Sequence, residues 1–351
     1  MGVMIYQISE NRQIPLFALS FYLLTLSMMN TMTYSRILGV GSYLPEKRIT
    51  NDDLAQMVET SDEWISQRTG IKARHIADDS EKTSDLAVKA AQNALSQANI
   101  HPNEIDLIIV GTVTGDYAFP STACLVQQKL GITNRCPAFD IQAACAGFMY
   151  AMTMADTYIR GGLAKKALII GAETLSRIVN WQDRNTCVLF GDGAGAAVLG
   201  ASDEPGIIHS KMCADGAFES VLHMNGRMNN GEWTGAKFIN MDGQAVFKFA
   251  VKSLAEVAQE TLNEANFPAE KIDWLVPHQA NSRIIDATAK HLGLPREKVI
   301  LTVAEHANTS AASIPLALDE GIRTGKIQRG QHLLLEGIGG GFAWGAMLLR
   351  Y

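Results

Sequence analysis

Residues 139–150 read Phe-Asp-Ile-Gln-Ala-Ala-Cys-Ala-Gly-Phe-Met-Tyr, a short apolar strand followed by a turn of small residues and the start of a helix. The apolar spacing predicts that this helix runs to about Arg160, so Cys145 falls at the junction of strand and helix. Backbone N–H groups at a helix start lack intrahelical partners, and the positive end of the helix dipole favours a thiolate. Such a site lowers a cysteine pKa from about 8.5 to roughly 3.5–7.5. Cys145 is therefore a candidate nucleophile; the alternative is a buried structural cysteine.

Composition limits the class of protein. The chain has 351 residues, which suits two fused units or one large layered unit, and 47% apolar residues supply a large core. The formal net charge of -6 argues against a nucleic-acid partner. The 5 cysteines are odd in number and form no C-x-x-C pair, which fits a reducing, cytoplasmic compartment without a disulfide framework or a structural zinc site. We therefore expect no metal.

The first 32 residues differ from the rest. Residues 14–29 (IPLFALSFYLLTLSMM) are almost wholly apolar, and no charge lies between Arg12 and Arg36. This run is short for a membrane-spanning helix, which needs about 20 apolar residues. It is closer to a signal-peptide core, yet Glu10 lies beside Arg12 and no A-x-A-like site follows. We expect residues 1–32 to be a misassigned start or a dispensable extension, with a membrane anchor or a cleaved signal as alternatives. The globular part begins near Thr33 in each case.

Two similar halves are predicted, residues 33–204 and 205–351. In the first, the continuous apolar strand at 105–111 indicates a sheet covered on both faces, and the helix after it closes with Lys-Leu-Gly-Ile at 129–132. In the second, an apolar strand at 272–276 leads through a loop into a helix with a similar ending. This weak internal repeat predicts an α/β fold in which both halves contribute strands to one layered core.

Three segments of the second half are candidates to meet Cys145. His278 directly follows a buried strand, where loops line crevices in α/β folds, and Asn308 lies in a run of small polar residues before a helix. The glycines at 337–341 follow another strand, and their bare backbone can point N–H groups at an oxyanion. Cysteine, histidine and asparagine together suit acyl-thioester chemistry, because one is a nucleophile and two donate hydrogen bonds to a carbonyl. A lone histidine at a strand end is more often structural.

Trp64 and Arg68 form a second candidate site. They are four residues apart on one face of a predicted helix, an arrangement that takes a planar ring and a phosphate together. The alternative is a half-buried tryptophan beside a solvated arginine. The glycines at 191–195 are not a dinucleotide fingerprint, because they lie between strands and no helix follows them.

Taken together, several segments resemble the β-ketoacyl-acyl-carrier-protein synthase III family. They occur in the family's order and span the chain from about residue 33 to its end: TSDEWI at 60–65 with RTGI at 68–71, DIQAACAGF at 140–148, FGDGAGAA at 190–197, VPHQAN at 276–281, NTSAAS at 308–313 and GGGF at 339–342.

This resemblance implies a thiolase-like fold with two similar halves, layered α-β-α-β-α, and a homodimer. It implies an acyltransferase, the initiating condensing enzyme of type II fatty acid synthesis. Acetyl or another short acyl group passes from coenzyme A to Cys145 and then condenses with malonyl-acyl carrier protein as carbon dioxide leaves. Coenzyme A enters as a thioester substrate, and no cofactor is implied. The partners are acyl carrier protein and acyl-CoA, with no nucleic acid, and a membrane only if residues 1–32 remain as an anchor.

The same residues allow two alternative activities. The nearest rival is a related condensing enzyme that uses longer acyl chains or serves secondary metabolism. Thiolase itself is disfavoured, because its second catalytic residue near the C-terminal glycines is a cysteine and no cysteine follows Cys213.

The resemblance also assigns roles to the candidate catalytic residues. His278 and Asn308 match the pair that holds the malonyl thioester carbonyl and stabilises the enolate. The backbone N–H groups of Cys145 and Gly340 match the oxyanion hole.

Further matches concern the binding of coenzyme A, the carrier protein and the acyl chain. Lys248 and Arg283 match residues that receive the acidic carrier protein, and Lys252 lies four residues from Lys248 on the same predicted helix. Phe119 matches a residue that closes the acyl pocket of the partner subunit. Ile338, where the family commonly has phenylalanine, borders the acyl pocket and leaves the choice of acyl group open. The residues expected along coenzyme A are Thr60, Trp64, Arg68, Arg184, Gly243 and Asn281, with Trp64 and Arg184 flanking the adenine.

Overall fold

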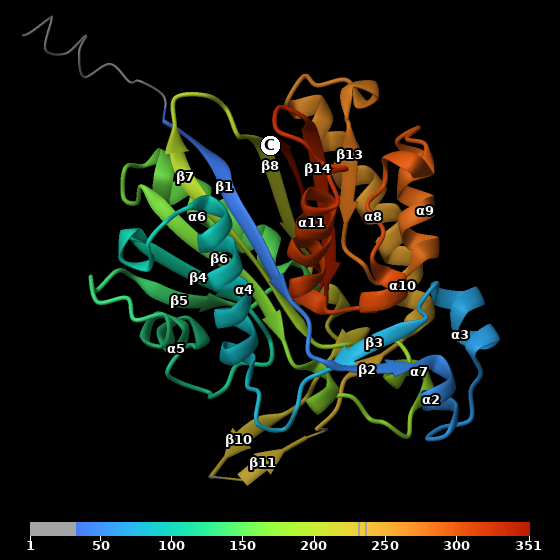
Figure 1. Ribbon diagram of the computed structural model, residues 1–351. Helices are drawn as coiled ribbons and strands as arrows, with labels where there is room; N and C mark the ends of the chain where they lie inside the picture. The colour runs from blue at the N-terminus through green and yellow to red at the C-terminus, as the bar shows by residue number, and fades with distance from the viewer. Residues whose placement is uncertain (1–32, 231, 236) are drawn as a thin grey trace, which may run out of the picture.

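The computed structural model describes residues 33–230, 232–235 and 237–351 (Figure 1). The predictions for residues 1–32 lie outside the described residues. Within the described ranges, no helix is both long and apolar enough to cross a membrane.

A first sheet is built from residues before 203. The pairing of β4 (Leu107–Gly111) with β5 (Ala138–Ile141) and with β6 (Lys166–Glu173) is parallel, while β7 (Gly193–Ser202) runs antiparallel to β6 and to β1 (Tyr34–Tyr43). The strand order is β1-β7-β6-β4-β5. The parallel pairing brings the C-terminal ends of β4, β5 and β6 to one edge of the sheet, and the segment that carries Cys145 directly follows β5.

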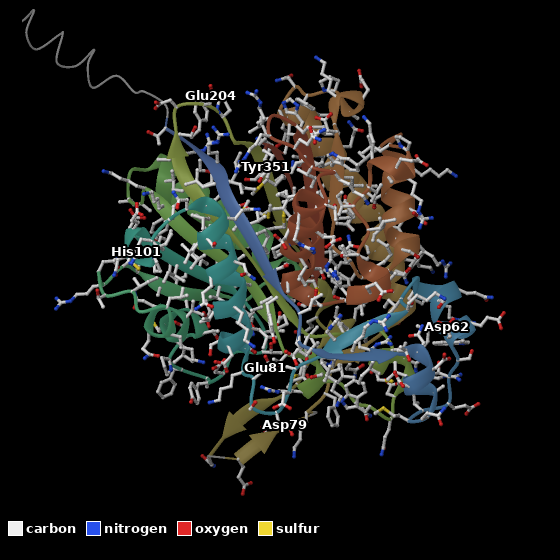
Figure 2. All side chains as sticks on the ribbon, in the orientation of Figure 1. Asp62, Asp79, Glu81, His101, Glu204 and Tyr351 are labelled. Carbon is white, nitrogen blue, oxygen red and sulfur yellow. The ribbon has the colours of Figure 1, made fainter. Side chains whose placement is uncertain are left out.

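A second sheet is built from residues after 206. The strand β13 (Trp274–Pro277) pairs in parallel with β14 (His332–Gly339), and β15 (Ala343–Arg350) pairs antiparallel with β14 and with β8 (Ile207–Ala214). The connection between the two sheets passes Glu204, labelled at the top of Figure 2 near Tyr351. The backbone N–H of Arg350 donates to Gly206 there at 2.7 Å, which fixes the C-terminal strand beside the connection.

Helices cover both sheets and fill the space between them. The helices α6 (Gly147–Arg160) and α11 (Ser313–Arg323) pack between the sheets in one apolar cluster. The outer face of the first sheet carries α4 (Thr83–Ala98) and α5 (Thr122–Lys129), and the outer face of the second carries α8 (Gly243–Glu264) and α9 (Ser282–His291). The result is the predicted α-β-α-β-α layering (Figure 1).

The strand β4 shows why the sequence predicted a sheet covered on both faces. Leu107 and Ile109 pack with α6 and α11 in the central layer, whereas Ile108 and Val110 pack against α4. All four side chains are fully buried. Because successive side chains on a strand point to opposite faces, a strand between two helical layers is apolar at every position.

Smaller elements lie outside the five layers. Two one-turn 3-10 segments, η2 (Ala144–Ala146) and η7 (Ser310–Ala312), precede α6 and α11. The lower right of Figure 1 shows β2, β3, α2, α3 and α7 grouped together. The bounds of the remaining strands and α-helices are β2 (Lys47–Thr50), α2 (Asn51–Ala55), α3 (Asp62–Thr69), β3 (Ala73–Ile76), α7 (Arg184–Cys187), β9 (Leu222–His223), β10 (Arg227–Asn229), β11 (Glu232–Thr234), β12 (Asn240–Met241) and α10 (Val303–His306).

Candidate active site

A pocket of about 1600 Å³ opens where the strand ends of both sheets meet. Cys145, His278, Asn308 and Gly340 all line it, although they come from four separate segments of the chain. The structure therefore brings together the four residues that the sequence predicted for the chemistry. In the described part of the chain, no group of three or more His, Cys, Asp or Glu residues is placed to hold a metal ion.

Cys145 lies in η2, between the end of β5 and the start of α6. Its side chain is 8% exposed, so the sulfur reaches the pocket but little solvent. The preceding residue, Ala144, has φ 45, a left-handed conformation that is unusual for a residue with a Cβ. The backbone is therefore held in an uncommon conformation next to the nucleophile, as is frequent at functional sites.

The expectation of a low pKa for Cys145 is wrong. Burial raises the pKa of the thiol to about 12, and the nearby Glu173 carboxylate raises it further, while a hydrogen bond that Ser310 donates to the thiolate form opposes the rise. The helix starts where the sequence predicted it, but burial raises the pKa of the thiol more than the helix start lowers it. The thiol is protonated at neutral pH and needs a proton acceptor to become a nucleophile.

His278 directly follows β13, and its backbone N–H donates to the carbonyl of Glu336 on β14 at 2.8 Å. Burial lowers the pKa of its imidazole to about 4, so the ring is neutral at physiological pH. A neutral imidazole carries one N–H donor and one acceptor nitrogen. Among the described residues, Nδ1 is buried and has no hydrogen-bond partner.

Asn308 is fixed by its backbone and by its own side chain. Its N–H donates to Leu189 O at 2.9 Å, and its carbonyl accepts from Gly191 N at 3.0 Å. Its Oδ1 accepts a hydrogen bond from the backbone N–H of Ser310 at 2.9 Å. Because the oxygen is held by this donor, the amide NH₂ is the part of the side chain that is turned outward as a donor.

The glycines after β14 lie beside the nucleophile. A Cβ at Gly337 would be 3.7 Å from both Cys145 O and His278 Cβ, so β14 passes between the two catalytic segments. Gly340 and Ile338 line the pocket. Ile338 is 7% exposed and belongs to an apolar cluster with Phe342 on the side of α8 and α9, which makes this wall of the pocket apolar.

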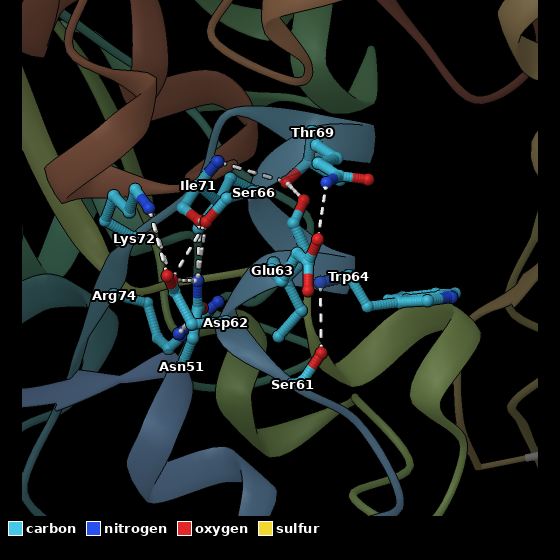
Figure 3. Close-up of polar contacts among 12 residues, drawn as sticks. Asn51, Ser61, Asp62, Glu63, Trp64, Ser66, Thr69, Ile71, Lys72 and Arg74 are labelled. Atoms are coloured by element: carbon cyan, nitrogen blue, oxygen red, sulfur yellow. Dashed lines mark hydrogen bonds and ion pairs between the residues drawn. The ribbon is translucent and has the colours of Figure 1, made fainter.

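Trp64 and Arg68 line another part of the pocket. The guanidinium carbons of Arg68 and Arg184 lie 4.5 Å and 5.2 Å from the Trp64 ring centroid, respectively. Figure 3 shows the indole extending away from the polar network around Asp62. The Asn281 side chain donates to Arg68 O at 3.0 Å and so ties α9 to α3. The predicted pair of ring and cation is present.

The other predicted binding residues differ in position. Gly243, Lys248, Asn281 and Arg283 line the pocket, and the Arg283 guanidinium lies 5.1 Å from the Phe247 ring. Lys252 is ion-paired with Glu256 at 3.9 Å. Neither Thr60 nor Arg184 borders the pocket, and Thr60 Oγ1 is buried with no partner among the described residues.

Phe119 lies on the loop between β4 and α5 and is 86% exposed. Tyr117 and Ala118 line the pocket of this chain, but Phe119 does not. A contact of Phe119 with a partner subunit stays a prediction.

Sequence reasoning missed Glu173, at the end of β6. Its carboxylate is fully buried and accepts hydrogen bonds from Thr114 Oγ1 at 2.5 Å and Ser310 Oγ at 3.0 Å. Burial raises the pKa of Glu173 to about 7. The available signal was a glutamate at the end of an otherwise apolar strand, a position where a charge is rare unless it has partners.

Comparison with known proteins places this arrangement in context. The model of the 3-oxoacyl-[acyl-carrier-protein] synthase III family matches residues 139–216, and the model of its C-terminal part matches residues 262–351. The chain is 66% identical over 320 residues to β-ketoacyl-[acyl-carrier-protein] synthase III of Neisseria gonorrhoeae, which covers 91% of this chain and 100% of that protein.

Solved structures agree with the sequence comparison. The crystal structure of the synthase III of Aquifex aeolicus superposes with a TM-score of 0.86 at 48% identity and covers 90% of this chain and 100% of that chain. That of Pseudomonas aeruginosa superposes with a TM-score of 0.85 at 41% identity and covers 91% and 98%. The predicted thiolase-like α/β fold is confirmed. The shared fold, the sequence identity over nearly the whole chain and the matches at both the cysteine and the histidine segments lead to one conclusion: the chain belongs to the 3-oxoacyl-[acyl-carrier-protein] synthase III family.

Proposed function

We propose that this protein initiates fatty acid synthesis by condensing a short acyl group, taken from acyl-CoA, with malonyl-acyl carrier protein. The observation that carries the proposal is the convergence of Cys145, His278 and Asn308 in one pocket that also reaches Trp64. The products are 3-oxoacyl-acyl carrier protein, carbon dioxide and coenzyme A. The alternative, a condensing enzyme for longer chains or secondary metabolism, is not favoured.

In the first half-reaction, the sulfur of Cys145 attacks the thioester carbonyl of acyl-CoA. Negative charge develops on the carbonyl oxygen, and the backbone N–H groups of Cys145 and Gly340 are the proposed donors to it. Fixed donors at a developing oxyanion stabilise the transition state more than the ground state. The coenzyme A thiolate leaves and takes a proton from solvent, so the acyl group remains on Cys145.

In the second half-reaction, His278 and Asn308 donate hydrogen bonds to the thioester carbonyl of the malonyl group. The neutral state of His278 and the outward amide of Asn308 support this role, because both groups donate without introducing a net charge. Loss of carbon dioxide places negative charge on that carbonyl oxygen as the enolate forms. The enolate carbon then attacks the acyl group on Cys145 and releases the thiolate of Cys145.

The proposal extends to the other predicted roles, some of which concern residues outside the pocket. The indole of Trp64 with Arg184 is the proposed adenine site, and Arg68 is the proposed phosphate partner. Lys248 and Arg283 at the pocket are proposed to meet an acidic carrier protein, whose charge they complement. The strongly exposed Phe119 supports a homodimer in which it closes the partner's acyl pocket. We also propose that residues 33–204 and 205–351 are the two similar halves.

A complete turnover tests this function. Purified protein is incubated with acetyl-CoA and malonyl-acyl carrier protein, and the carrier protein is analysed by intact-mass spectrometry. We expect acetoacetyl-acyl carrier protein, together with one carbon dioxide per product. Malonyl-acyl carrier protein that stays unchanged with each of acetyl-, isobutyryl- and hexanoyl-CoA would contradict the proposal.

A further inference from the structure

A chain of hydrogen bonds connects the nucleophile to a buried carboxylate. Ser310 Oγ donates its proton to Glu173 Oε1 at 3.0 Å. Ser310 and Cys145 line the same pocket, and the Ser310 side chain lowers the pKa of the Cys145 thiol through a hydrogen bond. While the thiol is protonated, the single hydroxyl proton of Ser310 points to Glu173, and the lone pairs of Oγ accept the S–H of Cys145. The Cys145 thiol is therefore the donor of this chain, the Ser310 hydroxyl both accepts and donates, and the Glu173 carboxylate is the acceptor. Once the sulfur has lost its proton, the hydroxyl of Ser310 donates to the thiolate, which is the hydrogen bond that lowers the pKa of Cys145.

The environment of Glu173 is built to hold a proton. The carboxylate is fully buried, and three groups besides Ser310 donate to it: Thr112 Oγ1 at 3.2 Å, Thr114 Oγ1 at 2.5 Å and the N–H of Val113. These donors are neutral, so they orient the carboxylate without neutralising its charge. A buried carboxylate without a cationic partner favours taking up a proton.

Other titratable groups near Glu173 are engaged elsewhere or face a different part of the site. Asp192, which precedes β7, accepts from Ala77 N and Ser176 Oγ, and Asp116 accepts from Ser84. His278 lines the pocket from the second sheet. In the described ranges, the ion pairs within 4.0 Å do not include Glu173.

We infer that Ser310 and Glu173 form the proton path that activates Cys145. As the sulfur attacks, the S–H bond breaks, its proton passes to Ser310 Oγ, and the original hydroxyl proton of Ser310 passes to Glu173. One negative charge moves from the carboxylate through the sulfur to the thioester carbonyl oxygen and then leaves with the coenzyme A thiolate, so the attack adds no net charge to the buried site. When condensation releases the Cys145 thiolate, the same path runs in reverse and returns the proton. Ser310 touches the reacting sulfur, whereas Glu173 acts through Ser310.

Two features of the free protein agree with this path. The pKa of Glu173, raised by burial to about 7, lets it accept and return a proton near neutral pH. Burial keeps the Cys145 thiol protonated, so the attack requires an acceptor. The inference deepens the proposed function and rests on it, because the attacked group is the acyl thioester.

The test is the rate of Cys145 acetylation in a single turnover with acetyl-CoA, measured from pH 5.5 to 9.5 by rapid quenching and mass spectrometry. The variants are Glu173→Gln, which removes the acceptor, and Ser310→Gly, which removes the hydroxyl. Glycine suits this position, because Ser310 has φ 48. The control is Ser35→Ala, which removes a buried hydroxyl that donates to Asp156 at 2.6 Å, away from the pocket.

We expect the wild-type rate to rise through an apparent pKa near 7 and then level. In both variants the rate at pH 8 falls about 100-fold, a typical size for general-base catalysis, and the inflection near pH 7 is lost. The Ser35→Ala profile matches wild type. If the rate in the variants fell equally at every pH, as expected when the residues have only a structural role, the inference would be overturned.

A Glu173→Gln variant whose acetylation rate does not fall would be equally decisive. The carboxylate charge raises the pKa of the thiol, so a Glu173 that acted only through its charge would give a variant that is as fast as wild type or faster above pH 7. That result would overturn the proton path.

A second reagent separates this inference from the proposed function. Iodoacetamide alkylation of Cys145, mapped by peptide mass spectrometry, needs no acyl-CoA. If acyl-CoA never acylates the wild type, the proposed function fails. A slowed alkylation at pH 8 in both variants still supports the path in that case, and an unchanged rate contradicts it.

Discussion

Gly339, at the end of β14, lies directly against the backbone of Cys145. A Cβ at Gly339 would be 2.5 Å from the Cys145 amide nitrogen and 2.9 Å from Ala144 Cβ, closer than real side-chain atoms approach. The second half of the chain therefore supports the segment that holds the nucleophile.

Gly339→Ala should displace this segment, because both close contacts involve the backbone or a short side chain that cannot swing away. We expect the acetylation rate to fall by at least about 100-fold, the cost of losing one fixed oxyanion donor. Gly216→Ala is the control, since a Cβ there meets nothing within 4 Å. Wild-type acetylation by Gly339→Ala would show that this contact does not position Cys145.

His278→Ala and Asn308→Ala should separate the two half-reactions. Both residues are proposed to stabilise the enolate, so decarboxylation of malonyl-acyl carrier protein should fall about 10²–10³-fold. Acetylation of Cys145 should fall much less. Rapid-quench acetylation and carbon dioxide release measure the two steps, and equal losses in both would refute this division of roles.

Arg184→Ala should weaken coenzyme A binding without slowing the chemistry. Its guanidinium lies 5.2 Å from the Trp64 ring centroid, and Arg184 does not border the pocket that holds Cys145, so the loss concerns the adenine site. We expect KM for acetyl-CoA to rise about 5-fold, the equivalent of about 1 kcal/mol for one cation–π contact, at constant kcat. Arg296→Ala, which removes an exposed arginine paired with Asp286, is the control. An unchanged KM in Arg184→Ala would place the adenine elsewhere.

Glu336 should make the protein less stable as the pH rises. Burial raises the pKa of its carboxyl from the ordinary value of 4.5 to about 8. The folded state therefore binds more protons than the unfolded state between pH 4.5 and 8, and the free energy of unfolding falls across this window. Its stabilising contribution is fully present below pH 4.5 and is lost as the pH passes 8.

Urea unfolding of Glu336→Gln at pH 5 and pH 9 tests this effect. The variant should lose about 3–5 kcal/mol less than wild type between the two pH values, the size expected of a pKa difference of this order. Glu270→Gln, at an exposed position, should behave as wild type. Identical pH dependence of wild type and Glu336→Gln would mean that Glu336 has an ordinary pKa in the folded protein.

Local patterns in the sequence predicted the layered α/β core and the candidate residues, while the family resemblance implied the five layers and the roles of Cys145, His278 and Asn308. Continuous apolar strands identified sheets covered on both faces, and the positions of Cys145 and His278 at strand ends placed them at one edge. The apolar run at 105–111 became β4, with alternate side chains in two cores.

The electrostatics of the site were not predictable in this way. The pKa of Cys145 depends on how deeply tertiary packing buries η2, and the helix start alone gave the wrong direction. Glu173 escaped notice because its partner Ser310 is 137 positions away in the sequence. The dimer contact of Phe119 depends on a second chain.

Intact-mass spectrometry before and after incubation with acetyl-CoA tests the central claim most directly, with peptide mapping to locate the modification. The account predicts one acetyl group per chain, attached to Cys145, and none on Cys145→Ala. Acetylation at another residue, or no acetylation of the folded wild type by acetyl-CoA and other short acyl-CoAs, would contradict it.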